Sequence, residues 1–214
     1  MKKRLLYSLF FISSIIFAQE APNDSISKSK VIFDFAGGLS SRIGKAEKTN
    51  DFILDNKINA SRNAYFIESS LLFQIAPNSE HYFGFKYNNF FDYINQNKLS
   101  ISFYGVSYLY SKEFKSKDNF NLDFSLGYIS YRDKEYFFDG YTIKGGNIGV
   151  RSSVSYLLKI TEGVYSGPKL GLQFGSIKDF TVENKTNSSQ SINLKGVSES
   201  VSNFDFGLVL RISL

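Results

Sequence analysis

The sequence contains no cysteine, and this absence excludes several kinds of chemistry. Without a thiol the chain has no disulfide, no thiolate nucleophile and no lipidated cysteine of the lipoprotein type. His81 is the only histidine, so a metal centre built from His and Cys clusters is excluded by count. We therefore expect no metal and no cofactor, and we interpret His81 as a residue of a turn or an interface.

Long apolar runs are missing from most of the chain as well. No apolar run of about 18 residues follows Ala18, so no transmembrane helix is expected there. Residues 1–18 differ, because three basic residues precede an apolar run from Leu5 to Phe17 that ends at small Ala18. This layout is typical of a secretory signal peptide. We predict a cleaved signal peptide over 1–18 and a flexible periplasmic segment over 19–30, in which residues 20–30 pair with nothing.

Charge of one sign is not in large excess once the leader is set aside. The formal net charge is +5, but three of the 25 Lys and Arg residues lie in 1–18 and none of the 20 Asp and Glu residues do. The remaining chain carries 22 basic and 20 acidic residues, a net charge of +2. This charge is too small to indicate a nucleic-acid partner, and no dense Lys/Arg tract indicates one either.

Apolar residues at every second position, by contrast, are abundant, and this is the pattern of strands with one apolar face. In residues 203–214 the even positions are all apolar, while the odd positions are mostly polar or small. The same alternation recurs along the chain and predicts eight strands after residue 30. We place them near 31–43, 64–76, 81–93, 99–111, 120–132, 146–160, 167–180 and 201–214.

The connections between these strands alternate in length. Apart from the third connection (94–98), which is short to medium, the odd-numbered connections are long (44–63, 133–145 and 181–200) and the even-numbered ones are shorter. Outer-membrane barrels have long extracellular loops and short periplasmic turns. The spacing therefore predicts an eight-stranded antiparallel up-and-down transmembrane β-barrel over 31–214, with both of its ends in the periplasm.

The second face of the predicted strands is polar and includes ten charged residues. In a membrane barrel the apolar face contacts lipid and these charges face the lumen, where we expect them to form a structural network that leaves no open pore. The ten residues are Asp34, Arg42, Glu68, Lys86, Asp123, Arg151, Lys159, Lys169, Asp205 and Arg211.

A soluble, calycin-like ligand-binding barrel would reverse the two faces, with the apolar side chains inside. The aromatic content favours the membrane, because 22 Phe and 14 Tyr suit the interfacial girdles of a membrane barrel. Many tyrosines also fall near the predicted strand ends: Tyr65, Tyr93, Tyr108, Tyr110, Tyr128, Tyr131 and Tyr156.

The predicted strand 99–111 does not keep a single apolar face. Leu99, Ile101 and Phe103 use odd positions, whereas the apolar residues from Tyr104 to Tyr110 use even ones. A β-bulge near Phe103–Tyr104 would reconcile the two halves.

The leader ending in FAQE, the alternation of long and short connections and the closing FDFGLVLRISL together carry a family resemblance. The chain resembles the small eight-stranded outer-membrane barrels of the OmpA/OmpX kind, and more particularly the barrel proteins of Bacteroidetes-type bacteria. The resemblance covers 31–214 and implies a Gram-negative outer-membrane location. Members often end in an aromatic residue, whereas this chain ends in Leu214.

The function that we expect is not enzymatic. Known barrel enzymes rely on a histidine near the outer leaflet, but His81 starts a strand after a short connection and so falls at the periplasmic rim. We expect the barrel to sit among outer-membrane lipid and lipopolysaccharide and to present loops 44–63, 133–145 and 181–200 to a protein partner or a surface. A narrow porin-type channel is an alternative, disfavoured because eight strands leave room only for side chains.

Closure of the barrel requires the first strand to pair with the last. Asp34 and Arg42 on the first strand and Arg211 and Asp205 on the last fall opposite each other in nearly one register. We therefore expect Asp34 to meet Arg211 and Arg42 to meet Asp205 on the lumenal face.

Overall fold

The computed structural model describes residues 30–44, 52–92, 98–135, 137–184, 189–193 and 198–214. The predicted signal peptide and residues 19–29 lie outside these ranges. Lys30 is described, and its carbonyl accepts a hydrogen bond of 2.9 Å from the backbone N–H of Gln74. The expectation that residues 20–30 pair with nothing is therefore wrong at its last residue, because Lys30 already extends the barrel wall.

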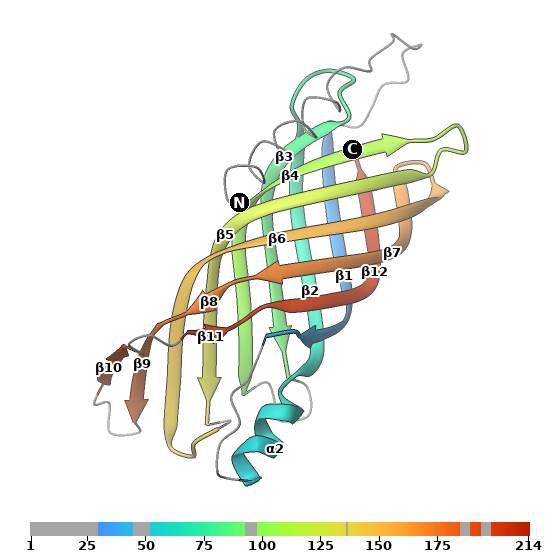
Figure 1. Cartoon of the computed structure of the whole chain (residues 1–214). Helices are drawn as coiled ribbons and strands as arrows, with labels where there is room; N and C mark the ends of the chain where they lie inside the picture. The colour runs from blue at the N-terminus through green and yellow to red at the C-terminus, as the bar shows by residue number, and fades with distance from the viewer. Residues whose placement is uncertain (1–29, 45–51, 93–97, 136, 185–188, 194–197) are drawn as a thin grey trace, which may run out of the picture.

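Eight long antiparallel strands close into a ring (Figure 1). Each pairs with its neighbour along the chain, and the first pairs with the last, which confirms the predicted barrel. The strands are β1 (Val31–Arg42), β2 (Asn63–Gln74), β3 (His81–Phe91), β4 (Leu99–Glu113), β5 (Asn119–Lys134), β6 (Tyr141–Thr161), β7 (Val164–Phe174) and β12 (Asn203–Ser213). All have at least 11 residues, enough for a tilted strand to cross a bilayer.

The two ends of the barrel differ. One end, the turn end, carries the short connections 75–80, 114–118 and 162–163, together with Val31 and Leu214, whose backbones exchange two hydrogen bonds. The tightest of these turns contains Gly163 at a φ of +71°, a conformation that other residues rarely adopt. The other end, the loop end, carries the connections 43–62, 92–98, 135–140 and 175–202.

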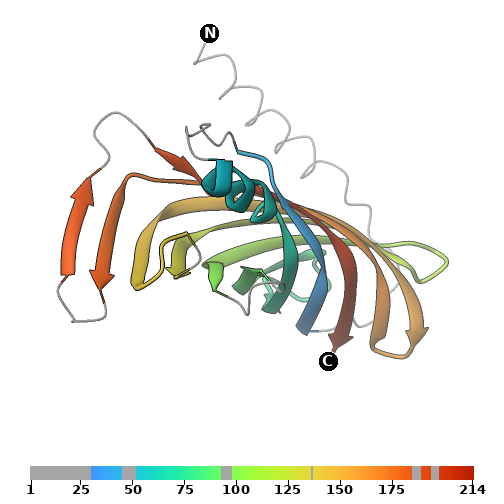
Figure 2. The same cartoon turned by 90° about the horizontal axis from the view of Figure 1, so that it is seen from below.

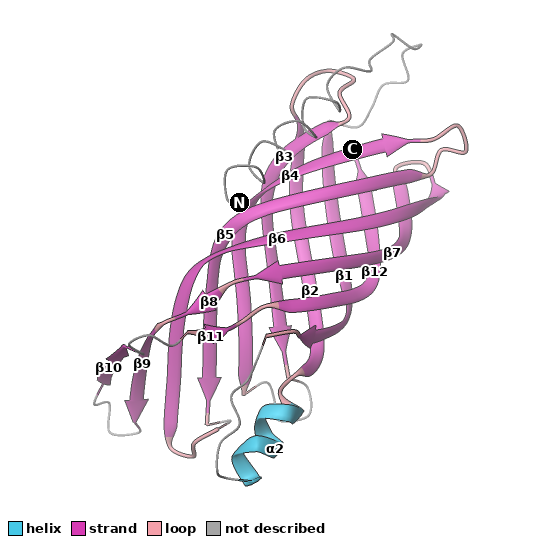
Figure 3. Cartoon of the chain, in the orientation of Figure 1, coloured by secondary structure: helices cyan, strands magenta, loops and turns pink. Residues whose placement is uncertain are grey.

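The loop end contains more regular structure than the sequence predicted. The expected loop 44–63 includes helix α2 (Phe52–Ala60), and β6 begins at Tyr141 inside the expected loop 133–145 (Figure 3). Beyond the ring, β6 pairs with β9 (Asp179–Asn184), which pairs with β10 (Ser189–Asn193), so the expected loop 181–200 is partly a hairpin. A second small pairing joins β8 (Ser176–Ile177) to β11 (Glu199–Ser200).

The first part of β6, β9 and β10 form a sheet extension that reaches past the barrel rim, as the view from below shows (Figure 2). In the described part of the chain, the structure contains no helix with the length and apolar character needed to cross a membrane.

Side-chain direction decides between the membrane and the soluble interpretation. On β12 the even-numbered apolar residues are exposed on the outer wall, while Asp205, Gly207 and Arg211 are buried inside, as the membrane interpretation predicts. The same outward apolar band continues around the ring, with Phe85, Phe124 and Leu208 each about half exposed or more. The soluble-barrel alternative, which requires the opposite direction, is therefore wrong.

Strand β4 has no bulge. Its pairing with β3 and with β5 is continuous from end to end, and Leu99, Ile101 and Phe103 simply point inward. The apolar residues change parity because the barrel interior is itself apolar at the loop end. Tyr131 points inward for the same reason, so it does not belong to the predicted outer girdle.

Candidate functional site

The interior of the barrel is the candidate site, and it is divided into layers by residue type. At the loop end a cluster that we call the loop-end plug is buried. At the turn end a smaller turn-end cluster is buried. Between the two clusters many of the inward side chains are polar or charged; on β2, for example, Glu68 and Ser70 lie between buried Phe66 and Leu72.

The loop-end plug comes mostly from neighbouring strands, and it consists of Ala64, Phe90, Leu99, Ile101, Phe103, Ile129, Tyr131, Ile177 and Val201. The turn-end cluster consists of Ile32, Leu72, Tyr82 and Leu109. Both clusters exclude water from the polar residues between them, so every charge there must be matched by a partner.

Glu68 is the centre of the polar layer. Its Oε2 accepts hydrogen bonds from Arg151 Nε at 3.0 Å and from Arg151 Nη2 at 2.8 Å. Its Oε1 contacts the ammonium groups of Lys169 and Lys86, the latter at 3.3 Å. One carboxylate thus contacts three cations. This arrangement is stable only because two further carboxylates balance the remaining positive charges.

Those two carboxylates belong to Asp205 and Asp123. Asp205 contacts Arg151 Nη2 at 2.5 Å, and Asp123 is ion-paired with Lys86. Three acids and three bases therefore form one connected group whose formal charges cancel. We call this group the charged layer; its members are Glu68, Asp123 and Asp205 with Lys86, Arg151 and Lys169.

Neutral side chains complete the hydrogen bonds of the two aspartates. Ser107 donates to Asp123 at 2.5 Å and Ser125 at 3.1 Å. Ser40 donates to Asp205, as does Asn203 Nδ2 at 2.6 Å. These partners could not be predicted from the sequence, because small polar residues occur on the lumenal face of nearly every strand and carry no distinct signal.

A second ion pair closes the barrel nearer the turn end. Asp34 lies directly opposite Arg211 in the pairing of β1 with β12. The guanidinium binds the carboxylate through two bonds, Nε to Oδ1 at 2.7 Å and Nη2 to Oδ2 at 2.8 Å. Its Nη1 donates to Ser111 and Asn121 across the lumen.

The other expected closure pair does not form. Asp205 lies opposite Ser40 in the β1–β12 ladder, and Arg42 lies opposite Asn203, two residues further on. Arg42 instead binds Glu199 at 2.8 Å and the carbonyl of Ser200 at the loop end. Lys159, the last of the ten predicted lumenal charges, is half-buried at the turn end, apart from the charged layer.

Two inward amides belong to the same region. Asn88 and Gln173 are fully buried, and no hydrogen bond joins their side chains to any other described residue. Asn88 lies opposite Glu68 in the β2–β3 ladder, and Gln173 lies opposite Arg151 and Asn203.

His81 occupies the turn end, as the sequence predicted. Its Nδ1 is 2.6 Å from the hydroxyl of Tyr108, and its ring also lies near that of Tyr110. Among the described residues, no group of three or more His, Asp and Glu side chains is arranged to hold a metal ion.

Comparison with known proteins bears on the fold. No protein-family model matches the sequence, and no curated protein matches it. The solved structure of Neisserial surface protein A is similar, with a TM-score of 0.56 and 12% identity over 86% of this chain and 96% of that one. A major outer membrane protein from Thermus thermophilus matches with a TM-score of 0.51 and 10% identity, covering 87% of this chain and 99% of that one.

The chain has the fold of a small outer-membrane β-barrel. At identities this low the likeness shows the fold alone. The outer membrane protease OmpT from Escherichia coli is also similar, with a TM-score of 0.45 and 9% identity over 72% of this chain and 64% of that one, which is too weak to carry an argument.

Proposed function

We propose that this protein is a non-enzymatic barrel of the bacterial outer membrane that holds its loop end at the cell surface for interaction with a partner. The outward apolar wall fits a lipid environment, because a band of exposed Phe, Leu and Ile residues surrounds the ring. A soluble protein would not expose so much contiguous apolar surface.

The filled interior is the observation that carries the proposal. The charged layer lies between the loop-end plug and the turn-end cluster, so the residues that could line a channel are used to fill it. Such a barrel serves as an anchor. A narrow channel of porin type is therefore the less favoured function.

The loop end is the part that can engage a partner. Helix α2, the β9–β10 hairpin and the end of β6 provide an ordered surface beyond the rim, and Phe138 and Tyr141 are about half exposed there. The turn end has only short connections. Under this proposal the loop end faces the outside of the cell and the turn end faces the periplasm.

An epitope-insertion experiment tests location and orientation together. A short tag is inserted between Asp139 and Gly140 at the loop end, and the matched control has the same tag between Asn78 and Ser79 at the turn end. On intact cells we expect antibody to bind the first tag only, and to bind the second after permeabilisation. If antibody binds neither tag on intact cells, the loop end is not exposed at the cell surface. If it binds only the turn-end tag on intact cells, the orientation is the opposite of the one proposed.

A further inference from the structure

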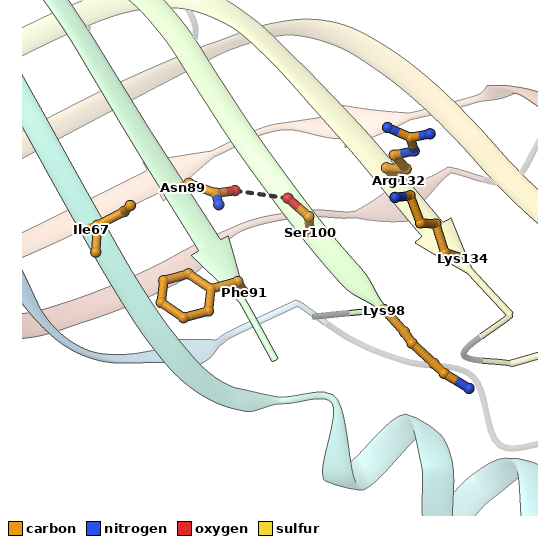
Figure 4. A pocket seen from close by; sticks show the side chains of 7 residues that line it. All are labelled: Ile67, Asn89, Phe91, Lys98, Ser100, Arg132 and Lys134. Atoms are coloured by element: carbon orange, nitrogen blue, oxygen red, sulfur yellow. Dashed lines mark hydrogen bonds between the residues drawn. The ribbon is translucent and has the colours of Figure 1, made fainter. Parts of the chain in front are cut away.

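The outer wall of the barrel has a concavity near the loop end that is rich in positive charge (Figure 4). It has a volume of about 340 Å³ and is open to the surroundings. Lys98, Arg132 and Lys134 line one side, while Ile67 and Phe91 line the other. We call it the basic concavity.

No carboxylate is among the residues that line the basic concavity with the three cations. Asp133 lies between Arg132 and Lys134 in sequence, but it is fully buried and points into the barrel, as does Asp92 near Lys98. Across the described residues, no ion pair joins Lys98, Arg132 or Lys134 to a carboxylate. By contrast Lys144, which lies opposite Arg132 on β6, is paired with Glu183 at 2.7 Å.

The floor of the concavity is held in place by hydrogen bonds. The hydroxyls of Ser100 and Ser102 both donate to Asn89 Oδ1, at 2.8 and 3.0 Å. Strand pairing places Phe91 opposite Ser100 and Ser100 opposite Arg132, so the apolar wall, the polar floor and the cations form one row across β3, β4 and β5. The backbone N–H of Lys134 donates to the carbonyl of Lys98 at 2.7 Å, which ties the start of β4 to the end of β5.

The height of the basic concavity on the wall indicates what it meets. Tyr87, Tyr104 and Tyr128 lie side by side on the same three strands and face outward. Outward tyrosines are typical of the boundary between the hydrocarbon and the headgroups of a membrane. Phe91, Ser100 and Arg132 each lie four residues further towards the loop end. That is about 13 Å along a tilted strand, which places the cations at the level of lipid headgroups.

We propose that the basic concavity binds the phosphate of an outer-leaflet lipid, with Lys98, Arg132 and Lys134 contacting the anion and Ile67 and Phe91 contacting the apolar part. This inference rests on the proposed outer-membrane location. Three cations without acidic partners complement a phosphate group, and a guanidinium binds phosphate oxygens in a fork geometry that suits it well. The apolar wall and the position beside the bilayer favour a lipid over a free anion.

The test uses the full folded chain in detergent micelles and measures its affinity for phosphorylated lipid A. The variant is Lys98→Gln/Arg132→Gln/Lys134→Gln. The matched control is Lys112→Gln/Lys115→Gln/Lys117→Gln, which removes three positive charges at the turn end. We expect the variant to bind about tenfold more weakly than the native chain and the control to bind within about twofold of it.

Two further probes identify the source of the phosphate. Dephosphorylated lipid A should bind the native chain weakly, with the affinity that phosphorylated lipid A has for the variant. Millimolar inorganic phosphate should not displace phosphorylated lipid A from the native chain. Equal binding by variant and native chain, or by the two lipids, overturns the proposal. Displacement by inorganic phosphate shows a general anion site and overturns the assignment to lipid.

Folding and the underlying function are checked separately. The three substituted side chains are on the outer surface, so the far-ultraviolet circular dichroism and heat-modifiable gel mobility of the variant should match those of the native chain. If the native chain does not insert into bilayers at all, the proposed function fails. If it inserts but shows no preference for the phosphorylated lipid, only the basic concavity proposal fails.

Discussion

Glu68 is the residue whose loss should cost the most stability. It is the one acid shared by Lys86, Arg151 and Lys169, all of them buried. Glu68→Gln leaves three cations with only two carboxylates in a water-poor interior, where removing one partner of a buried ion pair costs about 3–5 kcal/mol. We expect the free energy of unfolding to fall by that amount, as measured by urea unfolding of the protein refolded in micelles.

The matched control is Glu183→Gln, the same chemical change in the pair with Lys144, where both side chains are more than a third exposed. Exposed ion pairs contribute little to stability, so we expect the free energy of unfolding to fall by less than about 1 kcal/mol. A Glu68→Gln protein as stable as the control would show that solvent reaches the charged layer and screens it.

The sequence predicts which charged residues face the lumen, but it does not predict which of them pair with each other. Period-two alternation placed Glu68, Lys86, Asp123, Arg151, Lys169 and Asp205 on one face, and the structure brings these six together. The alternation could not indicate which charges meet across the lumen, because that depends on strand tilt. Arg42 shows this, since it binds Glu199 on a connection that had no predicted structure.

The register of β1 against β12 was the most specific element-scale prediction. The closure pair Asp34–Arg211 forms as expected, because a slip of one residue would turn both charges towards lipid. Phe35 lies opposite Leu210 on the outer wall in this register.

A disulfide tests that register, and the chain has no other cysteine to interfere. Phe35→Cys/Leu210→Cys should cross-link on mild oxidation and migrate as the closed form on a non-reducing gel. The control, Phe35→Cys/Phe206→Cys, should not, because its partners are displaced by about 13 Å along the strand, beyond the reach of a disulfide. Efficient cross-linking of the control alone would contradict the register.

The turn between β4 and β5 contains a carboxylate with an altered titration. The hydroxyl of Ser116 donates to Asp118 at 2.8 Å and, with the Tyr156 hydroxyl and the Lys159 backbone N–H, lowers the pKa of Asp118 below its usual value. A lowered folded-state pKa means that the stability these bonds contribute is present above the unfolded-state pKa. It is lost as pH falls through the folded-state pKa.

We expect Ser116→Ala to raise the pKa of Asp118 towards its ordinary value, as followed by carboxyl carbon chemical shifts during a pH titration. Ser79→Ala, in the neighbouring turn, serves as the control and should leave the Asp118 titration unchanged. An unchanged pKa in Ser116→Ala would show that the hydrogen bond does not persist in solution.

In β4 and at the loop end, the alternation of apolar residues does not predict the structure. Alternation identifies the lipid-facing side only while the inner side is polar, and Leu99, Ile101 and Phe103 lie in an apolar interior instead. The hairpin of β9 and β10 is short and polar, so its sequence is that of an ordinary loop. Its strand structure comes from pairing with β6 rather than from its own residues.

The whole barrel should not conduct ions. The charged layer and the two apolar clusters occupy the lumen, so we expect no stepwise current when the purified chain is added to a planar bilayer. A porin added to the same bilayer afterwards supplies the positive control. Reproducible conductance steps from the native chain would contradict the filled interior and favour the channel alternative.

The hydrogen-bonded network around the charged layer contains at least one residue from every strand of the ring: Ser40, Glu68, Lys86, Ser107, Asp123, Arg151, Lys169 and Asp205, in order from β1 to β12. The six charges come from β2, β3, β5, β6, β7 and β12 and cancel only when all six strands are in place, so a sheet that lacks one of these strands would hold an unmatched charge against hydrocarbon. The barrel should therefore unfold in a single cooperative step, and transitions followed by gel mobility and by circular dichroism should coincide. Separate midpoints would show that part of the ring persists alone.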